Sequence, residues 1–120
     1  MRPEDSLSTR SMELAVEILA LVRQLQEKHE FIVSRQLGKS GTSIGANIRE
    51  ARYAHSRADF IAKMQIALKE ANETGYWLEL LFRSGYLEED RYRHLEELCS
   101  SIRIMLIRSV QTAKKNSEMM

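Results

Sequence analysis

Apolar residues recur along most of this chain at steps of three and four, the spacing that places side chains on one face of an α-helix. In the first segment the apolar positions are Leu14, Ile18, Leu21, Val22 and Leu25. They predict a helix over residues 7–28. Asp5 and Ser6 stand where side-chain oxygens can accept hydrogen bonds from the first backbone amides of that helix.

The second segment, residues 31–54, combines an apolar face with three glycines. The apolar positions are Ile32, Leu37, Ile44 and Ile48. Gly38, Gly41 and Gly45 each cost about 1 kcal/mol relative to alanine inside a helix. Because these glycines share one face, they would let another backbone approach closely. We therefore predict a helix, with a break between Gly38 and Gly41 as the alternative.

The third segment has distinct end signals. Ser56 offers a hydroxyl to the first turn and Asp59 a carboxylate that reaches back, which resembles a capping box. Gly85 is placed to end the helix in a left-handed conformation. The apolar face between these signals consists of Phe60, Met64, Ala67, Ala71, Thr74, Leu78 and Leu81.

A fourth helix is predicted from about Glu88 to Lys114. Glu88, Glu89 and Asp90 suit the positive end of a helix dipole. Its core positions are Leu95, Leu98, Ile102, Leu106 and Val110. Four helices with short connections predict an all-α, antiparallel up-down-up-down four-helix bundle, a single domain over residues 1–120 with frayed ends at 1–6 and 115–120.

Composition narrows the class of protein further. The chain is 43% hydrophobic and 29% charged, which argues against disorder. A single cysteine, Cys99, allows no internal disulfide. Glu17 interrupts the longest apolar run, residues 14–22, which is also far shorter than the roughly 20 residues of a membrane span. These features predict a cytoplasmic protein with no membrane partner.

The charge distribution is uneven although the net charge is only +1. The stretch of residues 35–63 carries basic residues that are candidates for nucleic-acid contacts: Arg35, Lys39, Arg49, Arg52, Arg57 and Lys63. Near the carboxyl terminus no acidic residue stands between Glu97 and Glu118. A basic surface would attract phosphates. The alternative is that these residues only solvate helix faces.

The sequence predicts no catalytic residue, no cofactor and no metal site. Gly38-Lys39-Ser40 resembles the end of a phosphate-binding loop, but Val33 stands where that motif requires glycine, and no strand precedes it. Di-metal bundles use Glu-x-x-His pairs, and no glutamate here is followed by histidine at that spacing. We therefore expect a protein that is not an enzyme.

A group of polar residues lies on or beside the apolar faces: Ser43, Asn47, Glu50, Glu70 and Glu73. An ionised carboxylate buried without a partner would be prohibitively costly. We expect these side chains to form a structural polar network or a subunit interface that sets how helices pair.

The chain also carries extended blocks that resemble a known family. Residues 43–51 read SIGANIREA and residues 66–74 read IALKEANET, followed by Tyr76, Trp77 and Gly85. These blocks resemble the bacterial four-helix bundle family encoded by intervening sequences of 23S ribosomal RNA genes, also called S23 ribosomal proteins. A related member is the accessory protein of diversity-generating retroelements, which partners a reverse transcriptase and binds nucleic acid.

The resemblance implies an antiparallel bundle that assembles into a homopentamer and has no established catalytic activity. It also implies that the five polar residues named above are characteristic of the family: Ser43, Asn47, Glu50, Glu70 and Glu73. On this basis we expect an oligomeric accessory protein that contacts RNA or a ribonucleoprotein. The alternative is a protein–protein interaction scaffold with no role in nucleic-acid binding.

Overall fold

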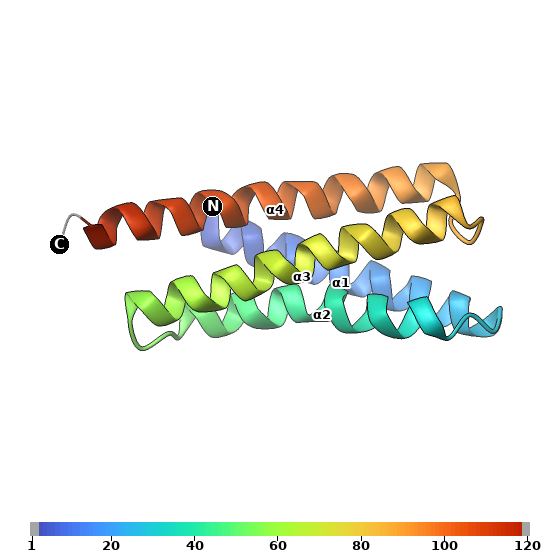
Figure 1. The fold of residues 1–120 in the computed structure, drawn as a ribbon, viewed down its shortest axis with the longest axis horizontal. Coiled ribbons are helices and arrows are strands. Elements are labelled where there is room, and N and C mark those ends of the chain that lie inside the picture. The colour runs from blue at the N-terminus through green and yellow to red at the C-terminus, as the bar shows by residue number, and fades with distance from the viewer. Residues whose placement is uncertain (1–2, 119–120) are drawn as a thin grey trace.

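The protein is an all-α bundle of four helices. The computed structural model describes the backbone of residues 3–118 and the side chains of residues 6–116. The helices are α1 (Pro3–Glu27), α2 (Ile32–Arg52), α3 (Arg57–Arg83) and α4 (Glu89–Glu118). Successive helices run antiparallel along a body of 53 × 23 × 22 Å (Figure 1). The predicted fold class is confirmed, and no strand occurs within residues 3–118.

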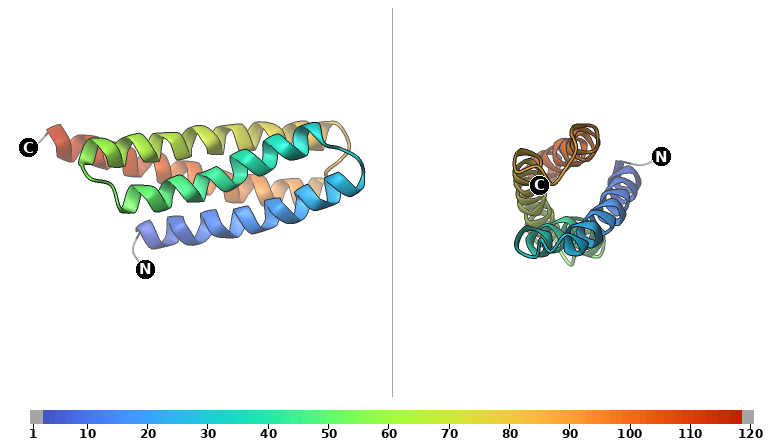
Figure 2. Two further views of the ribbon diagram at one scale, coloured as in Figure 1. Left: turned by 90° about the horizontal axis from the view of Figure 1, so that it is seen from below. Right: turned by 90° about the vertical axis from the view of Figure 1, so that its right-hand side faces the viewer.

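The helices do not enclose the core evenly. Each helix packs closely against the next one in the sequence, whereas α1 and α4 contact each other over fewer residues. The end view in Figure 2 shows these two helices diverging. The bundle is therefore least tightly closed along the boundary between α1 and α4.

The predicted apolar faces form the core. The largest fully buried side chains are Leu7, Leu14, Ile18, Leu21, Leu25, Leu37, Ile44, Leu78, Leu81, Leu95, Ile102 and Leu106. Leu98 is only half-buried and packs against this core, and the adjacent Cys99 is buried in its place. Burial of this apolar surface is the main force that holds the helices together.

Helix α2 is continuous through its glycines, so the alternative of a break between Gly38 and Gly41 is wrong. Gly41 is buried, and a Cβ there would lie 2.5 Å from Ile18 Cδ1. A side chain at Gly41 would therefore clash with Ile18 and require this residue or α1 to shift. The atoms that lie close to Gly41 belong to the side chain of Ile18, so the glycine admits a side chain of α1 there and not another backbone.

The helix boundaries lie close to the predicted ones at the three connections, and they differ at the start of α1. That helix begins at Pro3, so Ser6 lies inside it and the predicted cap by Asp5 and Ser6 is wrong. Residues 3–6 and 115–118 are helical. Residues 1–2 and 119–120 lie outside the described part of the chain, and fraying of the two ends stays a prediction.

The connections use short polar caps. Ser56 Oγ accepts a hydrogen bond from the Asp59 amide at 3.1 Å, as predicted. The Asp59 carboxylate accepts from the His55 amide at 3.4 Å, one residue before the position that a capping box uses. Gly85 has a φ of 86°, the predicted left-handed conformation. Glu30, which the pattern did not single out, caps α2 by accepting from the Val33 amide at 2.7 Å.

Candidate nucleic-acid interface

Basic side chains gather at the end of the bundle where α2 turns into α3. Arg49 and Arg52 are exposed in the last turn of α2, and Arg57 is exposed at the start of α3. Lys63 follows on α3 and is half-buried. Because α2 and α3 are antiparallel neighbours, four of the six basic candidates lie at this one end, which we call the α2–α3 end.

The other two candidates lie elsewhere along α2. Lys39 is exposed and stands ten residues before Arg49, roughly 15 Å along the helix axis. Arg35 is exposed one turn further away. The structure therefore separates Arg35 and Lys39 from the α2–α3 end, although the sequence had placed all six in one group.

Lys63 and Arg52, two of the basic residues at the α2–α3 end, each reach across to another helix. Lys63 Nζ lies 3.3 Å from Glu50 Oε2 and joins α3 to α2. Arg52 Nη1 lies 3.3 Å from Ser8 Oγ and reaches across to α1. Both contacts are at least partly exposed to solvent, so each contributes little to stability. The side chains can exchange these partners for a phosphate at low cost.

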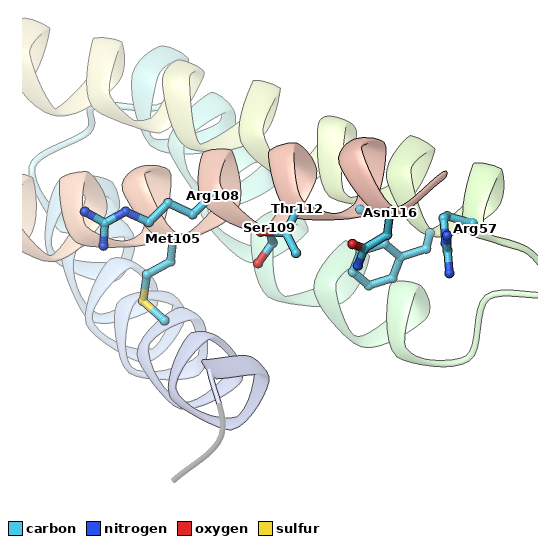
Figure 3. A pocket seen from close by; sticks show the side chains of 8 residues that line it. Arg57, Met105, Arg108, Ser109, Thr112 and Asn116 are labelled. Carbon is cyan, nitrogen blue, oxygen red and sulfur yellow. The ribbon is translucent and has the colours of Figure 1, made fainter. Parts of the chain in front are cut away.

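A groove opens beside this end, between the start of α3 and the last turns of α4. Its volume is about 730 Å³. It is lined by Arg57, Phe60, Met105, Arg108, Ser109, Thr112, Ala113 and Asn116. Figure 3 shows Arg57 and Arg108 at opposite ends of the groove, with Met105 beside Arg108 and with Ser109, Thr112 and Asn116 along α4 between the two arginines.

The groove combines apolar surface with positive charge. Phe60 and Met105 are half-buried and pack against the core, so their remaining surface faces the groove. Sequence reasoning had placed Phe60 in the core and had not named Arg108 as a candidate. The sequence feature that could have pointed to Arg108 is the stretch between Glu97 and Glu118, which contains no acidic residue.

Two members of the predicted polar group, Ser43 and Asn47, bond within their own helix. Ser43 Oγ donates to the Lys39 carbonyl at 2.7 Å. Asn47 Nδ2 donates to the Ser43 carbonyl at 2.8 Å. Glu50 pairs with Lys63, as described above. A role of this group at a subunit interface stays a prediction.

The two glutamates of α3 influence each other. Glu70 is half-buried and Glu73 is exposed. Burial, followed by the negative charge of Glu73, raises the pKa of the Glu70 carboxyl, while Lys69 and Lys39 lower it. These carboxylates therefore sit at the edge of the core, where water still solvates them.

A buried pair of hydroxyls joins α2 and α3 more directly than the predicted group. Thr74 Oγ1 lies 2.9 Å from Ser40 Oγ, and both residues are buried. Thr74 Oγ1 also donates to the Glu70 carbonyl at 2.8 Å. The sequence placed Thr74 on the apolar face, but it did not reveal Ser40 because the partners are 34 residues apart.

The one cysteine is not placed for nucleophilic chemistry. Cys99 is fully buried, and its thiol donates to the Ala71 carbonyl at 3.3 Å. Burial raises the pKa of this thiol from 9.0 to about 11. Since the thiolate is the reactive form, Cys99 is inert near neutral pH.

Comparison with known proteins places this fold in a family. The model of the 23S rRNA-intervening sequence protein family matches residues 6–108. The chain belongs to this family. The resemblance carried by residues 43–51 and 66–74 is thereby confirmed.

A solved structure agrees with this membership. The chain is similar to a protein of unknown function from the S23 ribosomal protein family of Bacteroides thetaiotaomicron VPI-5482. The two are 48% identical with a TM-score of 0.89, over 92% of this chain and 99% of the other. No curated protein matches this chain. The descriptions of the family and of the neighbour name no reaction.

Within the described residues, no helix is both long enough and apolar enough to cross a membrane. The helices instead alternate buried apolar faces with charged outer faces.

Proposed function

We propose that this protein is a non-enzymatic accessory protein that binds RNA, free or within a ribonucleoprotein, as a homo-oligomer. The observation that supports this most directly is the groove at the α2–α3 end, where Arg57 and Arg108 flank apolar surface from Phe60 and Met105. Arg49 and Arg52 add exposed positive charge at the same end.

This combination suits single-stranded RNA. Guanidinium groups bind phosphate oxygens with paired hydrogen bonds. Unstacked bases of loops and single strands stack on aromatic and apolar side chains, which is how most sequence-specific RNA recognition works. A groove of about 730 Å³ has the volume of a ligand pocket, so it can admit a base while the arginines hold the flanking phosphates.

Assembly would strengthen such binding. Met12, Val16 and Leu19 follow one outward face of α1, at spacings of four and three residues, and are 52%, 59% and 42% exposed. An apolar stripe on the surface is typical of a protein contact. The expected number of subunits, five, comes from the family resemblance. Five copies of the α2–α3 end on one RNA would sum weak contacts by avidity.

The test is RNA binding at two salt concentrations. We expect an RNA loop to bind at about 50 mM salt and to lose most of its affinity by about 200 mM, because phosphate contacts release counterions. Replacing one phosphate-binding arginine, Arg108→Ala, should weaken binding and lower the salt slope by about 1 for each bound chain.

Arg23→Ala is the matched control, because Arg23 is an exposed arginine of α1 outside the groove. It should bind RNA like the wild type. Absence of any RNA shift at low salt would contradict the proposal. So would equal losses in the Arg108 and Arg23 variants, since these would reflect net charge alone.

A second candidate is a protein interaction scaffold. Tyr53 and Tyr76 are 80% and 61% exposed, and exposed tyrosines are enriched at protein interfaces. Capture of one defined protein partner, unchanged by nuclease treatment and lost in Tyr76→Ala, would favour this function. Loss of the captured partner after nuclease treatment would favour RNA binding.

A further inference from the structure

Three side chains that are distant in the sequence converge on the boundary between α1 and α4. Glu13 and Glu17 lie one turn apart on α1, and His94 reaches them from the first half of α4. One ligand atom from each residue can be chosen so that all three lie within 4.8 Å of one another. None of these residues lines the groove, and His94 is roughly 16 Å along α4 from Met105.

The histidine is already aimed at a carboxylate. His94 Nε2 lies 2.9 Å from Glu17 Oε1 and 3.1 Å from Glu17 Oε2. When two donors bind one tetrahedral zinc ion at about 2.0–2.2 Å, they lie roughly 3.4 Å apart. His94 and Glu17 now lie at hydrogen-bond distance, and a separation of about half an ångström more would admit a shared ion. The Glu13 carboxylate is exposed and can close the remaining distance by turning its side chain.

Glu13 and Glu17 place two carboxylates on neighbouring turns of α1, and the one ionisable partner among the described residues is His94, beside Glu17. Two glutamates one helical turn apart repel each other. Within the described part of the chain, no lysine or arginine forms an ion pair with either of them. Arg91, on the preceding turn of α4, donates to Gln24 of α1. A cation between the glutamates would remove this repulsion.

We propose that Glu13, Glu17 and His94 bind one divalent transition-metal ion, with Zn²⁺ as the representative species. Two carboxylates and one imidazole form a donor set that suits zinc, whereas an imidazole donor disfavours Mg²⁺ and Ca²⁺. Water completes the coordination sphere at this exposed position. The ion links α1 to α4 along the boundary where the bundle is least tightly closed. This site is independent of the proposed RNA groove.

The test begins with the full chain freed of metal by a chelator. Titration with ZnCl₂ should show one ion per chain by calorimetry and a rise in the thermal midpoint, because ligands that bind only the folded state stabilise it. MgCl₂ at the same concentration should cause no rise. With ¹⁵N-labelled imidazoles, Zn²⁺ should shift the Nε2 resonance of His94.

Two variants separate an ion site from a plain hydrogen bond. Glu13→Gln keeps the contact between His94 and Glu17 but removes one ligand, so it should weaken Zn²⁺ binding at least about tenfold, the loss seen when even a supporting residue is removed. Its stability without metal should equal or exceed that of the wild type. His94→Ala should abolish the thermal rise.

His55→Ala is the control, because His55 is an exposed histidine in the turn between α2 and α3. It should bind Zn²⁺ like the wild type. Full Zn²⁺ affinity in the His94 or the Glu13 variant would overturn the proposal. An unshifted His94 resonance at saturating Zn²⁺ would overturn it as well.

Discussion

Gly41 shows how one absent side chain sets the distance between two helices. A Cβ at this position would lie 2.5 Å from Ile18 Cδ1, 3.0 Å from its Cγ2 and 3.4 Å from its Cβ. The end of the isoleucine side chain can move, but Cγ2 moves only by a change of χ1, which a β-branched residue in a helix disfavours, and Cβ moves only with α1. At Gly38 the nearest atom, Val22 Cγ2, would be at an ordinary contact distance of 3.5 Å.

Alanine at these two glycines should therefore have effects of opposite sign. Gly41→Ala overpacks the core, which costs about 1–3 kcal/mol, although better helix propensity offsets about 1 kcal/mol. Gly38→Ala gains that propensity without the clash and should stabilise the protein by up to about 1 kcal/mol. Urea unfolding of both variants measures the difference. Equal effects would show that α1 moves freely to accept a methyl group at Gly41.

Ionisation of the Cys99 thiol makes the free energy of unfolding depend on pH in the alkaline range. Its pKa is 9.0 in an exposed thiol and about 11 in the folded protein, because burial disfavours the thiolate. Above pH 9 the unfolded chain loses this proton first, so it binds fewer protons than the folded state. The contribution of Cys99 to the free energy of unfolding is therefore at its full value below pH 9. It decreases by about 1.4 kcal/mol per pH unit as the pH rises from 9 to 11.

Cys99→Ala isolates this contribution from the lysines and tyrosines that titrate in the same range. The free energy of unfolding of the wild type minus that of the variant should be constant below pH 9 and should decrease from pH 9 to pH 11. Urea unfolding across this range measures it. Parallel curves for the two proteins would mean that the thiol ionises equally in both states.

At the scale of helices, the contact between Ser40 and Thr74 specifies how α2 meets α3. Both hydroxyls are buried, and they lie 2.9 Å apart. Sliding of one helix along the other would break the bond between them and leave each hydroxyl with only a carbonyl of its own helix, Leu37 for Ser40 and Glu70 for Thr74. The apolar side chains around them tolerate small shifts more easily.

A double-mutant cycle tests this coupling between helices. Ser40→Ala or Thr74→Val should each cost about 1–3 kcal/mol, since each change weakens the bonding of the other group. The double variant should cost less than the sum, by about 1 kcal/mol. Ser43→Ala is a useful comparison, because Ser43 Oγ bonds within its own helix. Strictly additive costs would show that the two hydroxyls do not act together.

At the scale of the whole molecule, apolar side chains face outward on α1. Met12, Val16 and Leu19 lie on the side of that helix opposite to its buried residues. Under the proposed oligomeric function this face contacts another copy of the chain. Its burial there would add hydrophobic stabilisation that one chain cannot supply.

The pair of changes Val16→Lys and Leu19→Lys should therefore dissociate the oligomer without unfolding the chain. The expected mass of the wild type by light scattering is five times that of one chain, and the variant should be smaller with unchanged helical circular dichroism. Ile32→Lys serves as a control, because Ile32 is 81% exposed at the start of α2. Retention of the wild-type mass in the double variant would place the contact elsewhere.

Much of the fold could be predicted because local rules act over a few residues. The apolar spacing around Ile18 and Leu78, the cap at Ser56 and the left-handed Gly85 depend only on neighbours in the chain. The cap by Glu30 was missed, although it is equally local. The start of α1 was misplaced because Ser6 resembles a cap even inside a helix.

The candidate sites were less predictable. The six basic residues were selected by their closeness in the sequence, but Lys39 and Arg49 lie on different turns of one helix and only some of the six meet at the α2–α3 end. The groove depends on Arg57 and Arg108, which belong to different helices. Their relation follows from helix packing and leaves no periodic signal.

The sequence by itself therefore determined four helices, their buried faces and the family, because helical periodicity and capping are encoded within short segments. Only the tertiary structure decided which polar groups come together: Ser40 contacts Thr74, His94 contacts Glu17, and Arg57 and Arg108 line opposite ends of one groove. Each of these pairs joins residues that are 34 or more positions apart. These residues come close in space only when the apolar faces of different helices pack together, and that packing depends on the whole core.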